Sequence, residues 1–586
     1  MKNLGPQTPF AQQLHAEKYR AAGESFHEGM NRVAGALTEG RESFLVLRDI
    51  LEDLRFMPGG RIQAAVGSPK RVTPYNCFVS GTIMDSFIEG NGSIMARATE
   101  SASTQRMGGG IGYGFSWLRP RGAPIKKLGS VSSGPIEFMG IFDAICKCIA
   151  SSGHRRGAQM GVLRVDHPDI EEFIHCKQNS DKLTGFNISI GVTDEFMEAV
   201  RDDKDFDLRW GGEVYSTVSA RSLWDKIMRS TWDWAEPGVL FIDRINDANN
   251  LHYCEVIEAT NPCGEQPLPP YGACLLGSFN LTRYISFTDY NGPDQDEAGY
   301  SFNYKQFAAD IPHVVRAMDR VVDIATYPLF EQEQEAKNKR RMGLGVTGLA
   351  NAGETLGYPY GSEEFLEFEA GVLRMLRNEC YRASAHLAQE LGTFPLYNRD
   401  KYLAGEFIQD LPDDIRTLIM AGGIRNSHLT SIAPTGTISL CADNCSSGIE
   451  PVFSKSVRRT VQTFDGATQV MVEDYAFAQW GTEPVEANDV SAEEHLMVLA
   501  VAQRYMDSAV SKTCNVPSDM AWSDFKNLYM HAWELKCKGI TTFNAGGKRM
   551  GILTRATPAE LERMKDEIDE GLSCEMDPET GRSSCE

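Results

Sequence analysis

The sequence lacks any hydrophobic run long enough to cross a membrane. Its longest uncharged stretch, residues 266–282, contains proline and glycine, and the N-terminal residues lack the apolar core of a secretion signal. We therefore expect a soluble, cytoplasmic protein without a membrane partner. In that compartment the 14 cysteines should be mostly reduced, which favours buried thiols or redox chemistry over structural disulfides.

Short motifs of metal and nucleotide sites are also missing. There is no Cys-x-x-Cys pair and no Walker-type phosphate loop, and we predict no bound metal. A GxGxxG pattern at residues 343–348 follows the basic segment 337–341 instead of a hydrophobic strand, so we interpret it as close backbone packing. Four cysteines without neighbouring ligands are expected as small buried side chains: Cys146, Cys148, Cys441 and Cys445.

Positive charge is scarce. Fifty-eight Lys and Arg residues face 80 Asp and Glu residues, a net charge of −22, which disfavours nucleic acid as a bulk partner. Basic residues gather only in residues 154–164, 337–341 and 457–459. We expect these clusters to be solvated faces, and small anions remain the anionic ligands that the charge allows.

The composition is that of a globular protein, with 42% hydrophobic and 24% charged residues, and 586 residues suit several domain-sized units or one large barrel with additions. Residues 44–56 have helical spacing. Further on, strand-like runs at 77–83, 186–192 and 341–349 alternate with helical stretches such as 222–235. This alternation predicts an α/β fold.

Two segments carry candidate chemistry. Cys263 and Glu265 stand two residues apart, and in an extended loop both side chains would address one face, as a thiol and a proton-accepting carboxylate. A buried loop without chemistry is the alternative. The second segment, residues 431–453, has hydroxyls and a turn that suit either phosphate binding or an ordinary helix cap. Its candidate residues are Thr435, Gly436, Thr437 and Ser439.

Five segments together resemble the large catalytic chain of ribonucleotide reductases. In chain order they are MGGGIGYGFSWLRPRG, RRGAQMGVLRVDHPDIEEFI, NPCGEQPLPPYGACLLGSFNL, APTGTISL with NCSSGIEPVF, and AWELKCKGITTF. The resemblance covers about residues 50–550 and is closest to the adenosylcobalamin-dependent class II enzymes. It implies an α/β barrel of two five-stranded halves around a central finger loop. An N-terminal helical segment (1–56) would precede the barrel (57–555), and a flexible tail (556–586) would follow it.

The resemblance also implies roles for individual residues. Cys263 would form a thiyl radical that removes the 3′ hydrogen of a ribonucleotide, Glu265 would take the 3′ hydroxyl proton, and Asn261 would bind the ribose hydroxyls. Cys77 and Cys274 would supply the two electrons and end as a disulfide. The turn around Thr435 would hold the substrate phosphates.

Re-reduction would use the tail cysteines Cys574 and Cys585 as a shuttle to thioredoxin or glutaredoxin. The radical source follows from two absences. There is no Tyr-Tyr pair, which the class I large chain uses for radical relay, and no C-terminal glycyl radical segment of the anaerobic class. Adenosylcobalamin remains as the expected cofactor.

For regulation, the resemblance assigns Asp85, Ser86 and Arg119 to a site for deoxynucleoside triphosphate or ATP effectors at a homodimer interface. Residues 179–190 would carry the effector signal to the substrate base. About fifty residues precede the barrel, so we expect no ATP-cone domain and no inhibition by dATP through one.

Three alternatives stay open at this point. The chain could be a class I large chain that depends on a separate radical-generating subunit, a non-catalytic nucleotide-binding regulator, or a general dithiol oxidoreductase acting on proteins. The sequence also leaves open whether diphosphates or triphosphates are reduced, because either would present phosphates to the same turn.

Overall fold

The computed structural model describes residues 4–126, 128–151, 155–156, 158–178, 182–288, 299–463, 466–544, 546–548, 554–555, 575–576 and 583–584. Within these ranges no helix is both long and apolar enough for a membrane crossing. Cys574, Cys585 and residues 179–181 of the expected signal loop lie outside the described residues.

The chain begins with three helices, as the periodicity predicts. Ser25 caps the second helix, accepting from the Glu28 amide while the Glu28 side chain accepts from the Ser25 amide, and this capping box fixes where the helix starts. The helix then buries Met30, Val33 and Leu37, one face at helical spacing. The three helices are α1 (Pro9–Tyr19), α2 (Phe26–Leu37) and α3 (Arg41–Glu52).

A ten-stranded sheet forms the centre of the molecule. Five of its strands, β1, β2, β12, β15 and β18, are buried along their whole length, as expected where both faces of a sheet are covered. Strand order runs β1 (Phe56–Pro58), β15 (Ala273–Asn280), β2 (Cys77–Val79), β3 (Gly110–Gly114), β8 (Gln159–Arg164), β9 (Phe186–Val192), β12 (Gly238–Phe241), β22 (Gly539–Asn544) and β21 (Thr513–Val516), with β18 (Met342–Thr347) also pairing with β15.

The strands form parallel groups that meet in antiparallel fashion. Strands β2, β3, β8, β9 and β12 run parallel to one another, as do β15 with β18 and β21 with β22. The groups meet antiparallel where β2 lies beside β15 and where β12 lies beside β22. Two isolated parallel bridges join Leu344 to Thr430 and Ile432 to Val510. The predicted mixed α/β fold is confirmed.

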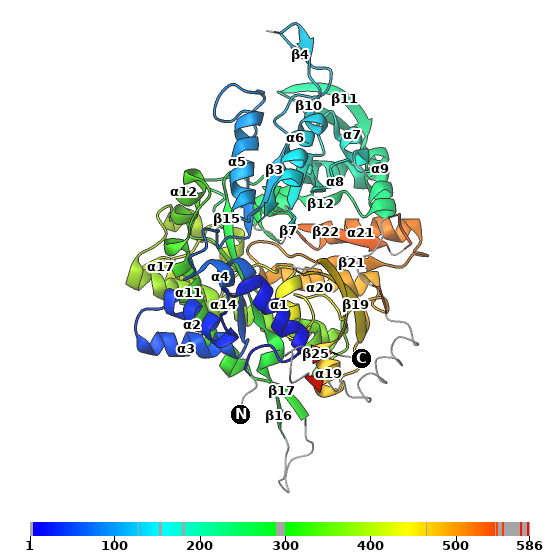
Figure 1. Ribbon diagram of the computed structural model, residues 1–586. Coiled ribbons are helices and arrows are strands. Elements are labelled where there is room, and N and C mark those ends of the chain that lie inside the picture. Colours follow the sequence, from blue (N-terminus) through cyan, green and yellow to red (C-terminus); the bar gives the residue numbers. More distant parts are fainter. Residues whose placement is uncertain are drawn as a thin grey trace.

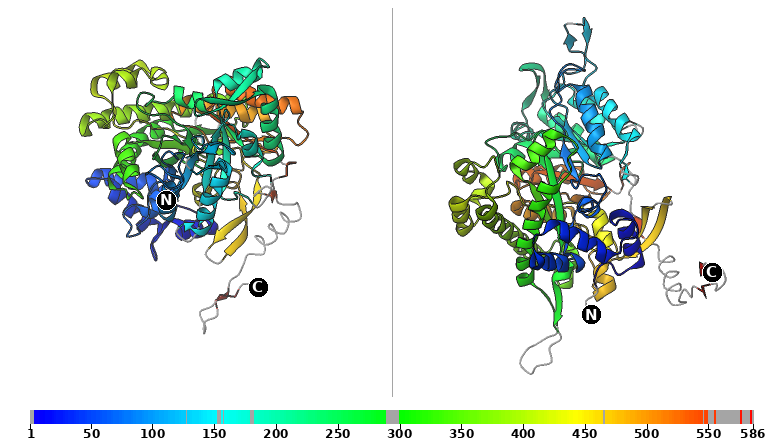
Figure 2. Two further views of the ribbon diagram at one scale, coloured as in Figure 1. Left: turned by 90° about the horizontal axis from the view of Figure 1, so that it is seen from above. Right: turned by 60° about the vertical axis from the view of Figure 1, so that its left-hand side comes forward.

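Helices pack around this sheet (Figures 1 and 2). In Figure 1 the upper part holds α6, α7, α8 and α9 beside β3 and β12, and the left side holds α11, α12, α14 and α17. The longer helices are α5 (Ile94–Arg106), α6 (Pro135–Cys148), α8 (Asp194–Arg201), α9 (Ala220–Trp234), α11 (Tyr304–Ile324), α12 (Phe330–Lys339), α14 (Glu363–Leu391), α17 (Asp413–Gly422), α20 (Ala492–Tyr505) and α21 (Trp522–Glu534).

Shorter elements complete the fold. The short helices are α4 (Gly60–Ala65), α7 (Ile170–His175), α10 (Ile242–Asp247), η1 (Leu281–Tyr284), α13 (Leu349–Thr355), α15 (Arg399–Leu403), α16 (Glu406–Gln409), α18 (Gly436–Cys441) and α19 (Tyr475–Trp480). Outside the sheet lie the hairpins β4 (Pro124–Ile125) with β5 (Ser130–Val131), β10 (Asp205–Trp210) with β11 (Glu213–Ser219), β16 (Ile285–Thr288) with β17 (Gly299–Phe302), and β19 (Ser456–Thr463) with β20 (Gly466–Glu473).

The basic segment 337–341 differs from its prediction as a solvated face. Its last three residues, Lys339, Arg340 and Arg341, are only 8%, 4% and 4% exposed. The physical reason is charge pairing, since each cation contacts buried or partly buried carboxylates, for example Arg340 Nε at 2.7 Å from Asp319 Oδ1. The segment therefore anchors the start of β18 in the interior.

The glycines of the GxGxxG pattern lie in and just after β18, and the packing interpretation is confirmed. A Cβ at Gly345 would stand 2.2 Å from the Ser431 carbonyl oxygen, so a neighbouring backbone occupies that space. Of the four cysteines expected in the interior, Cys146, Cys441 and Cys445 are buried, whereas Cys148 is exposed near the end of α6.

Candidate active site

A short hairpin presents the Asn-Pro-Cys-Gly-Glu segment. We use the name finger hairpin for β13 (Ala259–Thr260), β14 (Pro267–Leu268) and residues 261–266 between them. Strand β13 packs against β2, β3 and β8, and a Cβ at Gly112 of β3 would lie 1.7 Å from the Thr260 carbonyl oxygen. Glycine at position 112 is thus what lets the finger hairpin approach the sheet.

The tip of the finger hairpin is a turn and not the extended loop that was predicted. The Gly264 amide donates to the Asn261 carbonyl at 3.1 Å, and Gly264 has a φ of +85°. Side chains two apart therefore do not simply share a face, because the two-residue period holds only for extended backbone. Cys263 is exposed, whereas Glu265 is only 1% exposed.

Cys77 of β2 joins two residues of the finger hairpin. Its Sγ lies 3.1 Å from Asn261 Nδ2, which donates to it, and 3.7 Å from Glu265 Oε1. Burial raises the pKa of the Cys77 thiol well above its usual range, and the negative charges of Glu265 and Cys263 raise it further. The structure thus brings a neutral thiol, a carboxylate and an amide together, with Cys263 close enough to affect them.

Cys274 lies beside Cys77 on the neighbouring strand. The two residues are direct Cα partners in the antiparallel pairing of β15 with β2, and both are thiols in the structure. Partners of this kind project their side chains to the same face of a sheet. Burial raises the pKa of the Cys274 thiol well above its usual range, while the positive charge of Arg341 lowers it. All four buried members of the predicted catalytic set therefore gather around the finger hairpin.

The predicted phosphate residues sit at the start of α18. Thr435 has a φ of +53°, and its Oγ1 accepts from the Gly448 amide at 2.7 Å and lies 3.0 Å from Thr347 Oγ1. Ser439 Oγ lies 2.9 Å from Ser447 Oγ. These two hydroxyls hold the turn together, whereas Gly436 and Thr437 are exposed and open to a ligand.

Two of the predicted effector residues form an ion pair. Arg119 Nε lies 2.7 Å from Asp85 Oδ2, and the Arg119 amide donates to Asp85 Oδ1 at 3.1 Å. Ser86 Oγ accepts from the Glu89 amide at 3.0 Å. The surrounding segments carry large exposed apolar side chains, namely Met84, Phe87, Ile88, Leu128 and Val131.

Comparison with known proteins settles the family. The model described as "Ribonucleotide reductase, barrel domain" matches residues 76–479 and 484–543. The chain belongs to the ribonucleotide reductases. This confirms the resemblance on which the predicted residue roles rest.

Several curated relatives of this reductase are similar over most of its length. The "Vitamin B12-dependent ribonucleoside-diphosphate reductase" of Mycobacterium tuberculosis (strain CDC 1551 / Oshkosh) is 33% identical, covering 94% of this chain and 80% of the relative. The protein of the same name from Thermoplasma acidophilum is 34% identical, covering 91% and 69%. The "Vitamin B12-dependent ribonucleotide reductase" of Rhodopirellula baltica is 28% identical, covering 78% and 51%.

Sequence reasoning missed the residues that brace the finger hairpin of this reductase. Ser431 Oγ donates to the Glu265 carbonyl at 2.9 Å, and the Ala509 amide donates to the same oxygen at 3.0 Å. Asn187 Nδ2 donates to the Pro262 carbonyl at 2.9 Å. No local motif marks these contacts, because each joins residues far apart in the chain.

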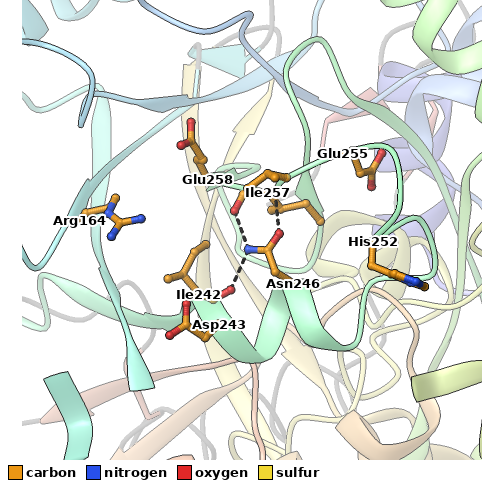
Figure 3. A pocket seen from close by; sticks show the side chains of 9 residues that line it. Arg164, Ile242, Asp243, Asn246, His252, Glu255, Ile257 and Glu258 are labelled. Carbon is orange, nitrogen blue, oxygen red and sulfur yellow. Dashed lines mark hydrogen bonds between the residues drawn. The ribbon is translucent and has the colours of Figure 1, made fainter. Parts of the chain in front are cut away.

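A cavity of about 280 Å³ lies beside residues 246–258, the arm that leads into the finger hairpin (Figure 3). The Asn246 side chain fixes this arm, since Nδ2 donates to the Ile242 and Ile257 carbonyls at 2.9 Å and Oδ1 accepts from the Ile257 amide at 2.8 Å. The predicted catalytic residues do not line this cavity. Its polar lining consists of Arg164, Asp243, Asn246, His252, Glu255 and Glu258.

Proposed function

We propose that this reductase converts ribonucleotides into 2′-deoxyribonucleotides by thiyl-radical chemistry that depends on adenosylcobalamin. The observation that carries the proposal is the gathering of Cys77, Cys274, Asn261 and Glu265 around the finger hairpin that bears Cys263. The names of the curated relatives support cobalamin dependence and favour diphosphate substrates.

The residues divide the reaction between them. The Cys263 sulfur, as a radical, takes the 3′ hydrogen atom, and Glu265 accepts the proton of the 3′ hydroxyl. Asn261 directs its amide to the ribose hydroxyls. Cys77, held neutral by burial, gives the proton with which the 2′ hydroxyl leaves as water. Cys77 and Cys274 together supply two electrons and two protons and become a disulfide. Cys263 then gives the 3′ hydrogen atom back and Glu265 returns the 3′ hydroxyl proton, so that the 2′ hydroxyl is replaced by hydrogen, water is released and the radical is restored.

The tip of the finger hairpin fits a cofactor that must reach Cys263. Cys263 is exposed, and nothing lies within 4 Å of the position that a Cβ on Gly264 would take. The face formed by these two residues would lie against the bound cofactor. Adenosylcobalamin, when bound, supplies the one-electron oxidation that turns the Cys263 thiol into a thiyl radical.

We further propose that the central sheet closes into the ten-stranded barrel of two five-stranded halves. In this barrel β1 would be an extra short strand beside β15, and residues 429–432 would take the tenth position, since Thr430 bridges to β18 and Ile432 bridges to Val510 just before β21. This segment leads directly into the turn at Thr435–Ser439, so the strand that supports Glu265 would also place the phosphate site. Residues 1–56 and 556–586 would then be the helical segment and the tail.

Regulation and re-reduction complete the proposal. The Asp85–Arg119 pair and Ser86 would bind the phosphates and sugar of a dNTP or ATP effector, with the Arg119 guanidinium released to the phosphates. The exposed apolar side chains of Phe87, Ile88 and Leu128 would pack against a second copy of the chain. Cys574 and Cys585 would pass electrons from thioredoxin or glutaredoxin to the active site.

The deciding experiment is reduction of CDP and CTP by the purified full chain with dithiothreitol and dNTP effectors, with and without adenosylcobalamin. We expect turnover only with the cofactor, and none in Cys263→Ser. Turnover that requires a separate radical-generating subunit would instead assign the chain to class I. Nucleotide binding without turnover would make it a regulator, and disulfide reduction independent of nucleotide would make it a general oxidoreductase.

A further inference from the structure

One row of residues at the redox pair runs from β2 across β15 to the residue that directly precedes β18. Cys77 of β2 is the Cα partner of Cys274 of β15. Strand β15 pairs in parallel with β18, where Leu275 is the partner of Met342, so the next position back places Arg341 beside Cys274. Residues in register on adjacent strands project to one face of the sheet. The order across the sheet is therefore thiol, thiol, guanidinium.

Arg341 is held in the interior by carboxylates. It forms an ion pair with Glu255, and its Nη1 lies 2.9 Å from Glu335 Oε1. Lys339 bonds to the same two carboxylates at 2.8 Å each. A further titratable neighbour, His428, accepts from Arg341 Nε at 3.3 Å, and burial keeps its pKa well below the usual range, so it is neutral.

The charges around this cluster leave room for one more anion. Two cations face two carboxylates, and burial together with the charge of Glu255 raises the pKa of Glu335. Whenever Glu335 holds a proton, the cluster has a net positive charge. A thiolate at Cys274 would then be the anion that restores neutrality.

The two thiols of the pair therefore differ in the sign of the charge that acts on each most strongly. Cys77 faces the Glu265 carboxylate and the finger hairpin, and it is 4% exposed. Cys274 is fully buried, and Arg341 is the charge that acts on it most strongly, with smaller opposing effects from Asp507 and Glu265. A departing negative charge is better stabilised on Cys274, beside the guanidinium, which directs an incoming nucleophile to Cys77.

We propose that Arg341 is a positioning residue that sets the direction of disulfide exchange at the redox pair. This inference rests on the proposed function in taking the Cys77–Cys274 disulfide as the oxidised product. A thiolate of a reducing dithiol attacks Cys77 Sγ and forms a mixed disulfide with it. The Cys77–Cys274 bond breaks, and its electron pair leaves on Cys274 Sγ beside the guanidinium.

The second half of the exchange closes the balance. The second thiolate of the dithiol attacks the dithiol sulfur that is bonded to Cys77. The bond to Cys77 breaks, and its electron pair leaves on Cys77 Sγ. The dithiol ends as a disulfide, having lost two electrons and two protons, and Cys77 and Cys274 end as thiols with those protons. The guanidinium is not consumed, and it acts only by stabilising the leaving thiolate.

The test uses the full chain with Cys574→Ser and Cys585→Ser, so that only an added thiol reduces the active site. The disulfide is made with diamide, which needs no ribonucleotide turnover, so failure here is distinct from failure of the proposed function. The oxidised chain reacts briefly with 2-mercaptoethanol and is quenched in acid. Free thiols are then alkylated with N-ethylmaleimide, and peptide mass spectrometry locates the mixed disulfide.

We expect the mixed disulfide on Cys77 in excess over Cys274 by about tenfold or more, because exchange favours the better leaving thiolate. Arg341→Gln should reduce this ratio about fivefold or more, while Arg341→Lys should largely keep it. Arg340→Lys is the matched control, since Arg340 pairs with Asp319 and Asp323 outside the row, and it should leave the ratio unchanged.

Glu335→Gln keeps Arg341 and removes a competing carboxylate, so it should raise the ratio even where Arg341→Gln fails to fold. Thermal unfolding of each variant separates altered exchange from altered folding. A parent chain with an even distribution, or with the mixed disulfide mainly on Cys274, would overturn the proposal. So would a folded Arg341→Gln variant with the parent ratio, or a Glu335→Gln ratio that does not rise.

Discussion

Cys77 and Cys274 occupy directly opposite positions on the antiparallel strands β2 and β15. Residues opposite one another in such a pair have Cα atoms about 4.5–5.5 Å apart. A disulfide requires about 4.4–6.8 Å. The backbone is thus already spaced for the bond, and closing it requires mainly side-chain rotation.

The first prediction concerns stoichiometry. Given cofactor and substrate but no reductant, a reduced chain with Cys574→Ser and Cys585→Ser should make about one deoxynucleotide and then stop, because the dithiol of Cys77 and Cys274 supplies only two electrons. Quenching, alkylation and mass spectrometry should find Cys77 joined to Cys274. Cys380, fully buried on α14, serves as the internal control and should remain a thiol. Product well beyond one per chain, or a different disulfide, would contradict this.

Glu265→Gln tests the proton acceptor. The amide keeps the shape of the side chain but cannot take the 3′ hydroxyl proton, so kcat should fall by about 10²–10⁴-fold with little change in KM. Glu258→Gln is the matched control. Glu258 directly precedes the finger hairpin, and its side chain accepts from Trp117 Nε1 at 2.8 Å. Steady-state kinetics on both variants decide, and equal losses would argue against a specific role for Glu265.

Two glycines of β3 offer a comparison within one strand. A Cβ at Gly112 would overlap the Thr260 carbonyl oxygen, whereas a Cβ at Gly114 meets Glu258 only at 3.8 Å. Gly112→Ala should therefore displace the finger hairpin and reduce kcat/KM by about 100-fold, as misplacement of reacting groups by an ångström does. Gly114→Ala should keep near-normal activity. Similar activity in the two variants would show that the approach at Gly112 does not position the site.

Stability should fall in mild acid because of His15. Burial lowers the pKa of His15 to about 4, and Arg20 Nε donates to its Nδ1 at 3.1 Å. The unfolded chain takes up this proton below about 6.5, so the contribution present above that pH is lost as pH falls towards 4. The full loss is about 3 kcal/mol from this residue.

Denaturant unfolding at pH 7 and pH 4.5 measures that loss. His15→Gln should show a smaller fall in the free energy of unfolding between the two pH values than the parent chain shows. The exposed His313 provides the control variant His313→Gln, which should fall as the parent does. A His15→Gln variant with the same pH dependence as His313→Gln would disprove the assignment.

The sequence allowed much of this to be predicted, but unevenly. The α/β alternation and the helices before residue 56 follow from local periodicity, which the chain obeys. The roles of Cys77 and Cys274 came only through family resemblance, because the two positions lie far apart in the chain and no local pattern joins them. They meet through the pairing of β2 with β15. Arg341 was misjudged as solvated, since buried ion pairs depend on carboxylates from other elements.

A disulfide between Cys77 and Cys274 would also change how rigidly the strands of the sheet are held together. It would form at one of the two antiparallel junctions between the parallel groups of strands, where β2 and β15 share two Cα partner pairs, Ala273–Phe78 and Cys274–Cys77. Oxidation would crosslink β2 to β15 through a disulfide, and reduction would remove this crosslink. The oxidised molecule should therefore be the stiffer one, and in the reduced molecule, which is the one ready for substrate, hydrogen bonds and packing alone hold β2 to β15.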